Sequence, residues 1–202
     1  MIESRVSAPP RRFWLTALPH AAAIVVLLGL TAWWSPAPFP TDQLMMERVG
    51  QGRIVPGCAD LNCFRILVPA VVEAFPGPSL PRWRSYAVIA NTAAAVAAGG
   101  LAHALGLRPV AVALTIWLSA LGAGSLATVH HPYNADPFVL LLAPITTWCL
   151  LSGRMRQAGA IAGVGIFAKE FAAAPLYIAA GAAGMARDWP AFWRSAAVAL
   201  GV

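Results

Sequence analysis

The placement of the ionisable residues constrains this chain more than any other feature of its sequence. Its 202 residues include only 14 Lys plus Arg and 8 Asp plus Glu, separated by long apolar stretches. One set of short connections is rich in arginine and holds Arg5, Arg11, Arg12, Arg108, Arg154, Arg156, Arg187 and Arg194. The other set holds most of the acids, a histidine pair and the only lysine: Asp42, Asp60, His130, His131, Asp136, Lys169 and Glu170. The two sets alternate, as in a chain that crosses a bilayer repeatedly with its arginines on the cytoplasmic side.

The composition favours the same interpretation. Charged residues make up 11% of the chain, against roughly 25% in soluble domains, and the mean hydropathy is +0.68. So few charges cannot cover a water-exposed surface, and the bilayer must be the solvent for much of the chain. The net charge of +6 would suit a nucleic-acid-binding protein, but the arginines stand singly or in pairs in short turns. We therefore expect membrane lipid as a partner and no nucleic acid.

The apolar runs predict an all-α fold, a polytopic transmembrane helix bundle that forms a single domain over residues 1–202. A span needs about 20 apolar residues. About six spans are expected, at residues 13–34, 85–107, 109–129, 138–152, 158–168 and 171–186, of which the last three are short. Another apolar run, 191–202, stops part-way through a span, so we expect the N-terminal part of a larger protein.

The N-terminus and the first loop set the expected topology. Arg11 and Arg12 precede an apolar run too long for a signal peptide, which predicts an uncleaved anchor with a cytoplasmic N-terminus in the inner (plasma) membrane. In the loop that follows, residues 41–49 and 64–75 are expected to form amphipathic helices at the membrane interface. Cys58 and Cys63 of this loop are compatible with a disulfide or with two free thiols.

Lys169 and Glu170 are adjacent charges inside an otherwise apolar stretch. Ionisable residues at membrane depth are costly and are functional candidates by default. Adjacent helical positions diverge by about 100°, so the two charges need separate partners: a phosphate for Lys169, and an arginine or a hydroxyl for Glu170. The alternative is a lysine that snorkels to the interface while its glutamate stays in water.

A short polar loop between two apolar runs holds His130, His131 and Asp136. Imidazoles and a carboxylate can bind a metal ion, transfer protons or contact a phosphate. Consecutive residues rarely point to the same place, so the two histidines are not expected to share a metal ion. The alternative is a polar turn that caps two helices, with Asn134 and Asp136 as turn formers.

Asp42 and Arg65 are the candidates in the long loop after the first span. A carboxylate near the outer membrane face can act as a general base toward a hydroxyl, and Asp42 can equally be an N-terminal helix residue that interacts with the helix dipole. Arg65 can bind a lipid phosphate or serve as a headgroup anchor. The chain has no Walker A loop, no dinucleotide fingerprint, no H-E-x-x-H and no G-x-S-x-G motif.

With these residues placed, the layout resembles the GT-C superfamily of membrane glycosyltransferases, which use polyprenyl-phosphate-linked sugars. The family has one span, then a long outer loop with an early acid, which Asp42 resembles. Asp136-Pro137 looks like the Asp-Pro that precedes a span in that family, and Lys169-Glu170 resembles its Lys-Glu at the end of a small-residue helix. Arg65, with Leu67 and Pro69, is similar to a segment of uncharacterised bacterial members.

Two departures from the family pattern stand out. The pair of acids usual in the first loop is not clear, because Glu47 lies five residues beyond Asp42. The C-terminal portion of the family is also missing from this chain.

The resemblance implies transfer of a sugar from a polyprenyl-phosphate donor to an acceptor hydroxyl or amine on the outer face. Asp42 would be the catalytic base, with inversion by direct in-line attack. Four residues would neutralise the phosphate leaving group: Arg65, His130, His131 and Lys169. Asp136 and Glu170 would orient those cations or contact the sugar. No cofactor is expected beyond the lipid-linked donor, and a divalent metal stays open.

Two other function classes use the same residues. A transporter or flippase would line a path with its intramembrane charges, and it predicts an inverted repeat. A non-enzymatic membrane scaffold would use the charges only as anchors. The three-dimensional arrangement discriminates between them, since the enzyme needs Asp42, Asp136 and Lys169 at one outer-facing cavity.

Overall fold

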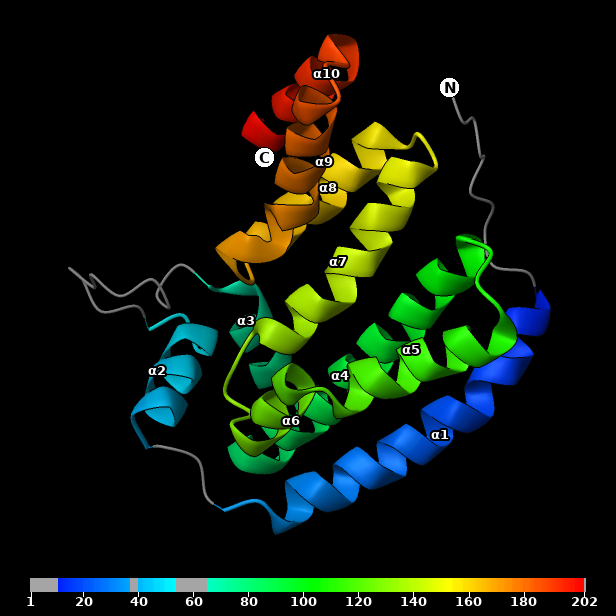
Figure 1. The fold of residues 1–202 in the computed structure, drawn as a ribbon. Helices are drawn as coiled ribbons and strands as arrows, with labels where there is room; N and C mark the ends of the chain where they lie inside the picture. Colours follow the sequence, from blue (N-terminus) through cyan, green and yellow to red (C-terminus); the bar gives the residue numbers. More distant parts are fainter. Residues whose placement is uncertain (1–10, 37–39, 54–64, 202) are drawn as a thin grey trace.

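The computed structural model describes residues 11–36, 40–53 and 65–201, and every regular element within these ranges is helical (Figure 1). Three stretches are long and apolar enough to cross a bilayer: α1 (Arg11–Trp34), α4 (Ser79–Ala104) and Pro109–His130. The third divides at Gly122, whose backbone is extended with ψ at 155°, into α5 (Pro109–Leu121) and α6 (Ala123–His130). Apolar helices of this length indicate a membrane protein.

The remaining apolar helices are shorter. α7 (Asp136–Leu151), α8 (Met155–Ile166), α9 (Ala174–Met185) and α10 (Trp189–Leu200) contain 16, 12, 12 and 12 residues. At 1.5 Å per residue none of them reaches the roughly 30 Å thickness of a bilayer core. The all-helical class is therefore confirmed for the described residues, whereas a bundle of about six spans stays a prediction.

Two small helices follow α1, as the sequence predicts. α2 (Pro40–Gly50) contains the first segment expected to be helical, 41–49, and α3 (Leu67–Glu73) forms the middle of the second, 64–75. Their location at a membrane interface stays a prediction. Cys58 and Cys63, the two cysteines of the first loop, lie outside the described residues.

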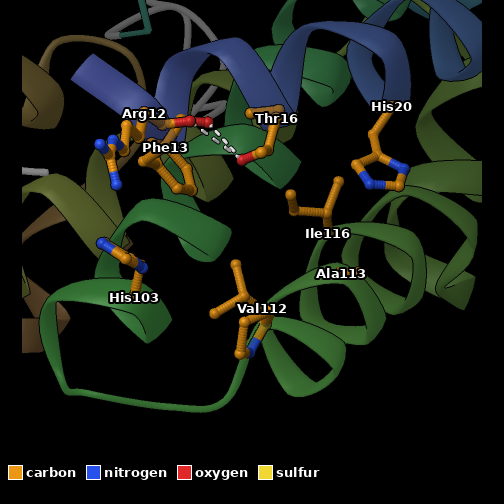
Figure 2. A pocket seen from close by; sticks show the side chains of 10 residues that line it. Arg12, Phe13, Thr16, His20, His103, Val112, Ala113 and Ile116 are labelled. Atoms are coloured by element: carbon orange, nitrogen blue, oxygen red, sulfur yellow. Dashed lines mark hydrogen bonds between the residues drawn. The ribbon is translucent and has the colours of Figure 1, made fainter. Parts of the chain in front are cut away.

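Contacts at both ends fix α1 and α4 as antiparallel neighbours. Near the start of α1, the ring of Phe13 stacks on that of His103, with ring centroids 5.4 Å apart (Figure 2). At the other end, Arg84 donates a hydrogen bond of 2.8 Å to the carbonyl of Ser35. Between these contacts the two helices bury apolar side chains, among them Ile24 and Leu28 of α1.

α5 and α6 lie beside α1 and run parallel to it, because residues near the start of α1 contact α5 and residues near its end contact α6. The indole of Trp117 donates to Nδ1 of His20 at 3.1 Å, and Ser35 Oγ lies 2.8 Å from Nδ1 of His130. α4 approaches α5 closely through Gly99, where an added Cβ would overlap the side chain of Ile116. Small residues permit such close approach between helices in lipid.

The connections between the helices lie at two opposite ends of the structure (Figure 1). The arginine end comprises the start of α1, the α4–α5 turn and the α7–α8 turn, with Arg108 in the second and Arg154 in the third. The polar end comprises α2, α3, the α6–α7 loop and the connection between α8 and α9. The sorting of arginines is incomplete, because five of them belong to segments of the polar end: Arg48, Arg53, Arg65, Arg82 and Arg84.

Replacing Gly99 by Ala should destabilise the contact between α4 and α5. The new methyl group overlaps Ile116, and overpacking of this kind costs about 1–3 kcal/mol. Thermal unfolding of the detergent-solubilised chain measures the effect. Gly29→Ala on α1 is the matched control, because nothing lies within 4 Å of its added Cβ. Equal melting temperatures for the two variants would show that α4 and α5 do not pack through Gly99.

Candidate functional site

A buried apolar cluster joins the segments of the polar end. Its centre is Trp83, at the start of α4, whose side chain is 0% exposed. The residues packed in this Trp83 cluster come from α2, α3, α4, the α6–α7 loop and the end of α8: Met46, Val68, Val72, Trp83, Tyr133, Ala135 and Ala168. Every segment that carries a candidate polar residue other than His130 is therefore attached to one core.

A charged clamp fixes α3 against α4. Arg82 donates to the carboxylate of Glu73 at 2.6 Å, and the indole of Trp83 donates to the other oxygen of that carboxylate at 3.1 Å. Arg82 also donates to the carbonyls of Glu73 and Phe75, at 3.1 and 2.6 Å. The Glu73 side chain is only 8% exposed, so hydrogen bonds from these partners stabilise its carboxylate in place of water.

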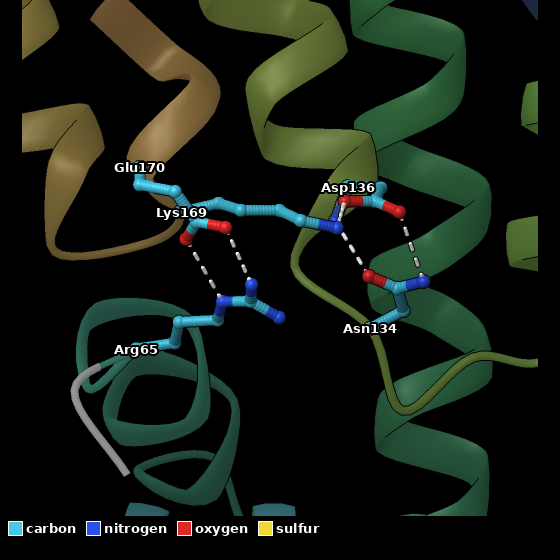
Figure 3. Close-up of polar contacts among 5 residues, drawn as sticks. All are labelled: Arg65, Asn134, Asp136, Lys169 and Glu170. Atoms are coloured by element: carbon cyan, nitrogen blue, oxygen red, sulfur yellow. Dashed lines mark hydrogen bonds and ion pairs between the residues drawn. The ribbon is translucent and has the colours of Figure 1, made fainter. Parts of the chain in front are cut away.

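Lys169 forms an ion pair with Asp136 (Figure 3). Lys169 is an extended residue between α8 and the short 3₁₀ helix η2 (Glu170–Ala173), and Asp136 opens α7. Asn134 holds Asp136 in place, since its side-chain amide donates to the carboxylate at 3.1 Å and its carbonyl oxygen accepts from the Asp136 backbone at 2.9 Å. The lysine side chain is 16% exposed and the aspartate 35% exposed. The pair is thus reachable from outside.

Glu170 pairs with Arg65 and not with its neighbour Lys169 (Figure 3). Nε and Nη2 of Arg65 donate to the two carboxylate oxygens at 3.2 and 2.7 Å, which is the bidentate geometry of a strong pair. The expectation that the two adjacent charges take separate partners is confirmed. The arginine lowers the pKa of Glu170, chiefly through this hydrogen bond. A backbone bond of 3.0 Å from Leu67 to Phe167 holds the two segments together.

A cavity of about 310 Å³, here called the polar cavity, opens beside the Lys169–Asp136 pair. Its polar wall contains Lys169, Asp136, Asn134 and His131, and the rest of its wall comes from α6, α7 and Phe171. Two wall residues, Gly124 and Leu140, also line a second cavity of about 510 Å³ between α4, α5, α6 and α7. This apolar cavity extends toward Leu105 and Leu107 at the arginine end, so the two cavities adjoin one another.

The two adjacent histidines take different environments. His131 lines the polar cavity, whereas His130 is hydrogen-bonded to Ser35 of α1 and is not part of that wall. They therefore do not face one ligand, as expected for consecutive residues. Among the described residues no group of three or more His, Cys, Asp or Glu side chains could hold a metal ion.

Asp42 lies apart from these residues. It is an exposed residue in the first turn of α2 and does not line the polar cavity. Of the three residues expected at one cavity for an enzyme, the structure therefore brings together Asp136 and Lys169 but not Asp42. A carboxylate in that position interacts favourably with the helix dipole. Its assignment as a catalytic base stays a prediction, as do the phosphate-binding roles of Arg65, His130, His131 and Lys169.

Sequence reasoning missed the residues that hold the site in place. The sequence pattern includes Glu73 only within the amphipathic segment 64–75, and it does not single out Arg82. A usable signal was present, since opposite charges flank the turn Pro76-Gly77-Pro78, in which Gly77 has a positive φ of 110°. The pairing of Ser35 with His130 had no such signal, because 95 residues separate the two.

Comparison with known proteins adds no relative: no family model, no curated protein and no solved structure matches the chain.

Replacing Glu73 by Gln should destabilise the protein by about 3 kcal/mol, because it leaves the charge of Arg82 without its partner in a largely buried position. Thermal or denaturant unfolding in detergent measures the change. Glu47→Gln is the matched control, since the carboxylate of Glu47 accepts from Gln43 within α2 and is only half-buried. A loss no larger than that of the control would show that the clamp does not hold α3 on α4.

The stabilisation of the fold by the Arg65–Glu170 pair should be present at neutral pH and should be lost in acid. The pKa of Glu170 is lower in the folded chain than in the unfolded chain. The pair therefore stabilises the fold above the unfolded value of about 4.3 and loses this effect only as pH falls through the lower, folded value. A double-mutant cycle of Arg65→Gln and Glu170→Gln, read as melting temperatures from pH 7 to pH 3, measures the coupling. Coupling that is absent at pH 7, or lost by pH 5.5, would contradict the pairing.

Proposed function

We propose that this chain is a membrane glycosyltransferase that moves a sugar from a polyprenyl-phosphate donor to an acceptor at the outer face of the membrane. The observation that carries the proposal is the junction of two cavities with different walls. The polar cavity contains a lysine, a histidine and a carboxylate, and it adjoins the larger apolar cavity. A lipid phosphate has the same division, with a charged group at one end and an apolar chain at the other.

The phosphate of the donor would bind at Lys169. Asp136 holds the ammonium group of Lys169 at the cavity wall, and Asn134 holds Asp136. An incoming phosphate would share the lysine with Asp136, because an ammonium group has three N–H donors. His131 on the same wall adds a further polar contact. A cation fixed beside the leaving phosphate stabilises the charge that develops when the sugar departs.

The polyprenyl chain would occupy the apolar cavity. Small side chains dominate its α4 wall, where Ala94, Ala98 and Ala102 leave room between the helices. The cavity runs from the polar end toward the arginine end, which is the direction a lipid chain takes through half of a bilayer. The arginine-bearing turns at the far end are consistent with a cytoplasmic location for that end.

The chemistry would be a single displacement. The acceptor oxygen attacks the anomeric carbon of the sugar, and its proton passes to a carboxylate that acts as general base. The bond between that carbon and the phosphate oxygen breaks, and the polyprenyl phosphate leaves with the electron pair. Attack from the side opposite the phosphate inverts the sugar carbon. Asp42 is the proposed base, and α2 would bring it to the acceptor from outside the cavity. The donor already carries an activated sugar, so the reaction needs no cofactor.

The proposal is tested with membranes that contain the full chain and with undecaprenyl-phosphate-linked glucose, mannose or arabinose carrying a radiolabel in the sugar. Lys169→Met should lower the transfer rate by about 100-fold or more, because it removes the cation at the leaving group. Asp42→Asn should lower the rate by a similar factor through loss of the base. Arg53→Gln, an exposed arginine of the polar end outside the cavity wall, is the control and should retain full activity.

An inhibition assay with a fragment of the donor distinguishes binding of the lipid phosphate from transfer of the sugar. Farnesyl phosphate should inhibit transfer by the wild type, whereas farnesol, which lacks the phosphate, should not. Lys169→Met should weaken inhibition by farnesyl phosphate, and Asp42→Asn should leave it unchanged because Asp42 lies outside the cavity. Transfer that is as fast in both variants as in the wild type would overturn the proposal.

A further inference from the structure

A third cavity, of about 360 Å³, lies at the arginine end, between the start of α1, the end of α4 and the start of α5 (Figure 2). Its wall is mainly apolar and includes Phe13, Ala17, Val112, Ala113 and Ile116. It shares no wall residue with the polar cavity or the apolar cavity. A site here is therefore separate from the proposed transferase chemistry.

Positive and polar groups gather at the mouth of this arginine-end cavity. Arg12 is exposed, and the structure gives its guanidinium no acidic partner within the described ranges. His103 lies on the same side and stacks on Phe13 (Figure 2). None of the described residues that line the cavity is acidic, and Arg11 and Arg108 belong to the same end of the structure. The mouth therefore favours an anionic group.

The far side of the cavity holds a histidine in a fixed tautomer. The indole of Trp117 can only donate, and it donates to Nδ1 of His20 at 3.1 Å. Nδ1 is therefore the acceptor nitrogen, and the proton of the neutral ring is on Nε2. His20 lies eight residues, or about 12 Å of helix, further into α1 than Arg12. His20 thus bounds the deep end of the cavity, and its Nδ1 already accepts a hydrogen bond from Trp117.

We propose that the arginine-end cavity binds an anionic phospholipid of the surrounding bilayer. The lipid phosphate lies between Arg12 and His103, and an acyl chain fills the apolar space between α1 and α5. The charged mouth and the apolar wall thus match the headgroup and the chain of one molecule. A water-soluble phosphate would leave the apolar wall unused.

The headgroup part of the proposal is tested by native mass spectrometry of the full chain released from detergent micelles. Palmitoyl-oleoyl phosphatidylglycerol and the matching phosphatidylcholine are titrated, and the fraction with bound lipid is measured. Phosphatidylglycerol should bind several-fold more tightly to the wild type. Arg12→Gln should weaken its binding by about tenfold, the expected loss for one charge-assisted hydrogen bond. Arg156→Gln removes an exposed arginine of the same end outside the cavity and should have no such effect.

The deeper part of the proposal is tested with Ala113→Leu, which fills the apolar space without changing the charge. This variant should weaken the binding of phosphatidylglycerol, because the acyl chain loses the space that it occupies between α1 and α5.

Three results would overturn the site. If Arg12→Gln and Arg156→Gln weakened phosphatidylglycerol binding equally, the arginine end would attract anionic lipid without a specific site. An unchanged affinity in Ala113→Leu would show that no chain enters the cavity. Displacement of the lipid by millimolar inorganic phosphate would assign the mouth to a soluble anion.

Discussion

The packing of Trp83 against the Glu73–Arg82 pair is the interaction on which the polar end depends. One indole is both the centre of an apolar cluster and a hydrogen-bond donor to a buried carboxylate. The carboxylate in turn binds the arginine that precedes the indole in the chain. Because α2, α3, the α6–α7 loop and the end of α8 all pack on this cluster, the positions of the candidate side chains follow from it.

Two ion pairs lie beside the Trp83 cluster, and they connect different segments of the chain. Arg65–Glu170 joins the segment before α3 to the segment after α8, and it is a connection between distant parts of the chain. Lys169–Asp136 joins the same segment to α7 and faces a cavity. The two adjacent charges therefore make different connections: Glu170 joins the segment after α8 to Arg65, and Lys169 joins it to Asp136 at the wall of the polar cavity.

The sequence was sufficient to predict what depends on local pattern. Apolar length predicted α1, α4 and the Pro109–His130 stretch, and the divergence of neighbouring helical positions predicted separate partners for Lys169 and Glu170. It could not predict what depends on tertiary distance. Nothing local shows that Arg65 reaches Glu170 across 105 residues, that His130 meets Ser35, or that Asp42 stays outside the cavity.

The interruption at Gly122 has a mechanical consequence. A continuous helix from Pro109 to His130 would be a rigid rod, whereas the extended residue is a joint between α5 and α6. The hydroxyl of Ser125 donates to the carbonyl of Ser119 at 2.7 Å and so replaces one of the helical bonds that the joint removes. Gly122, Gly124 and Ser125 all line the apolar cavity. Rotation about this joint would therefore widen or narrow that space while the flanking helices keep their own internal bonding.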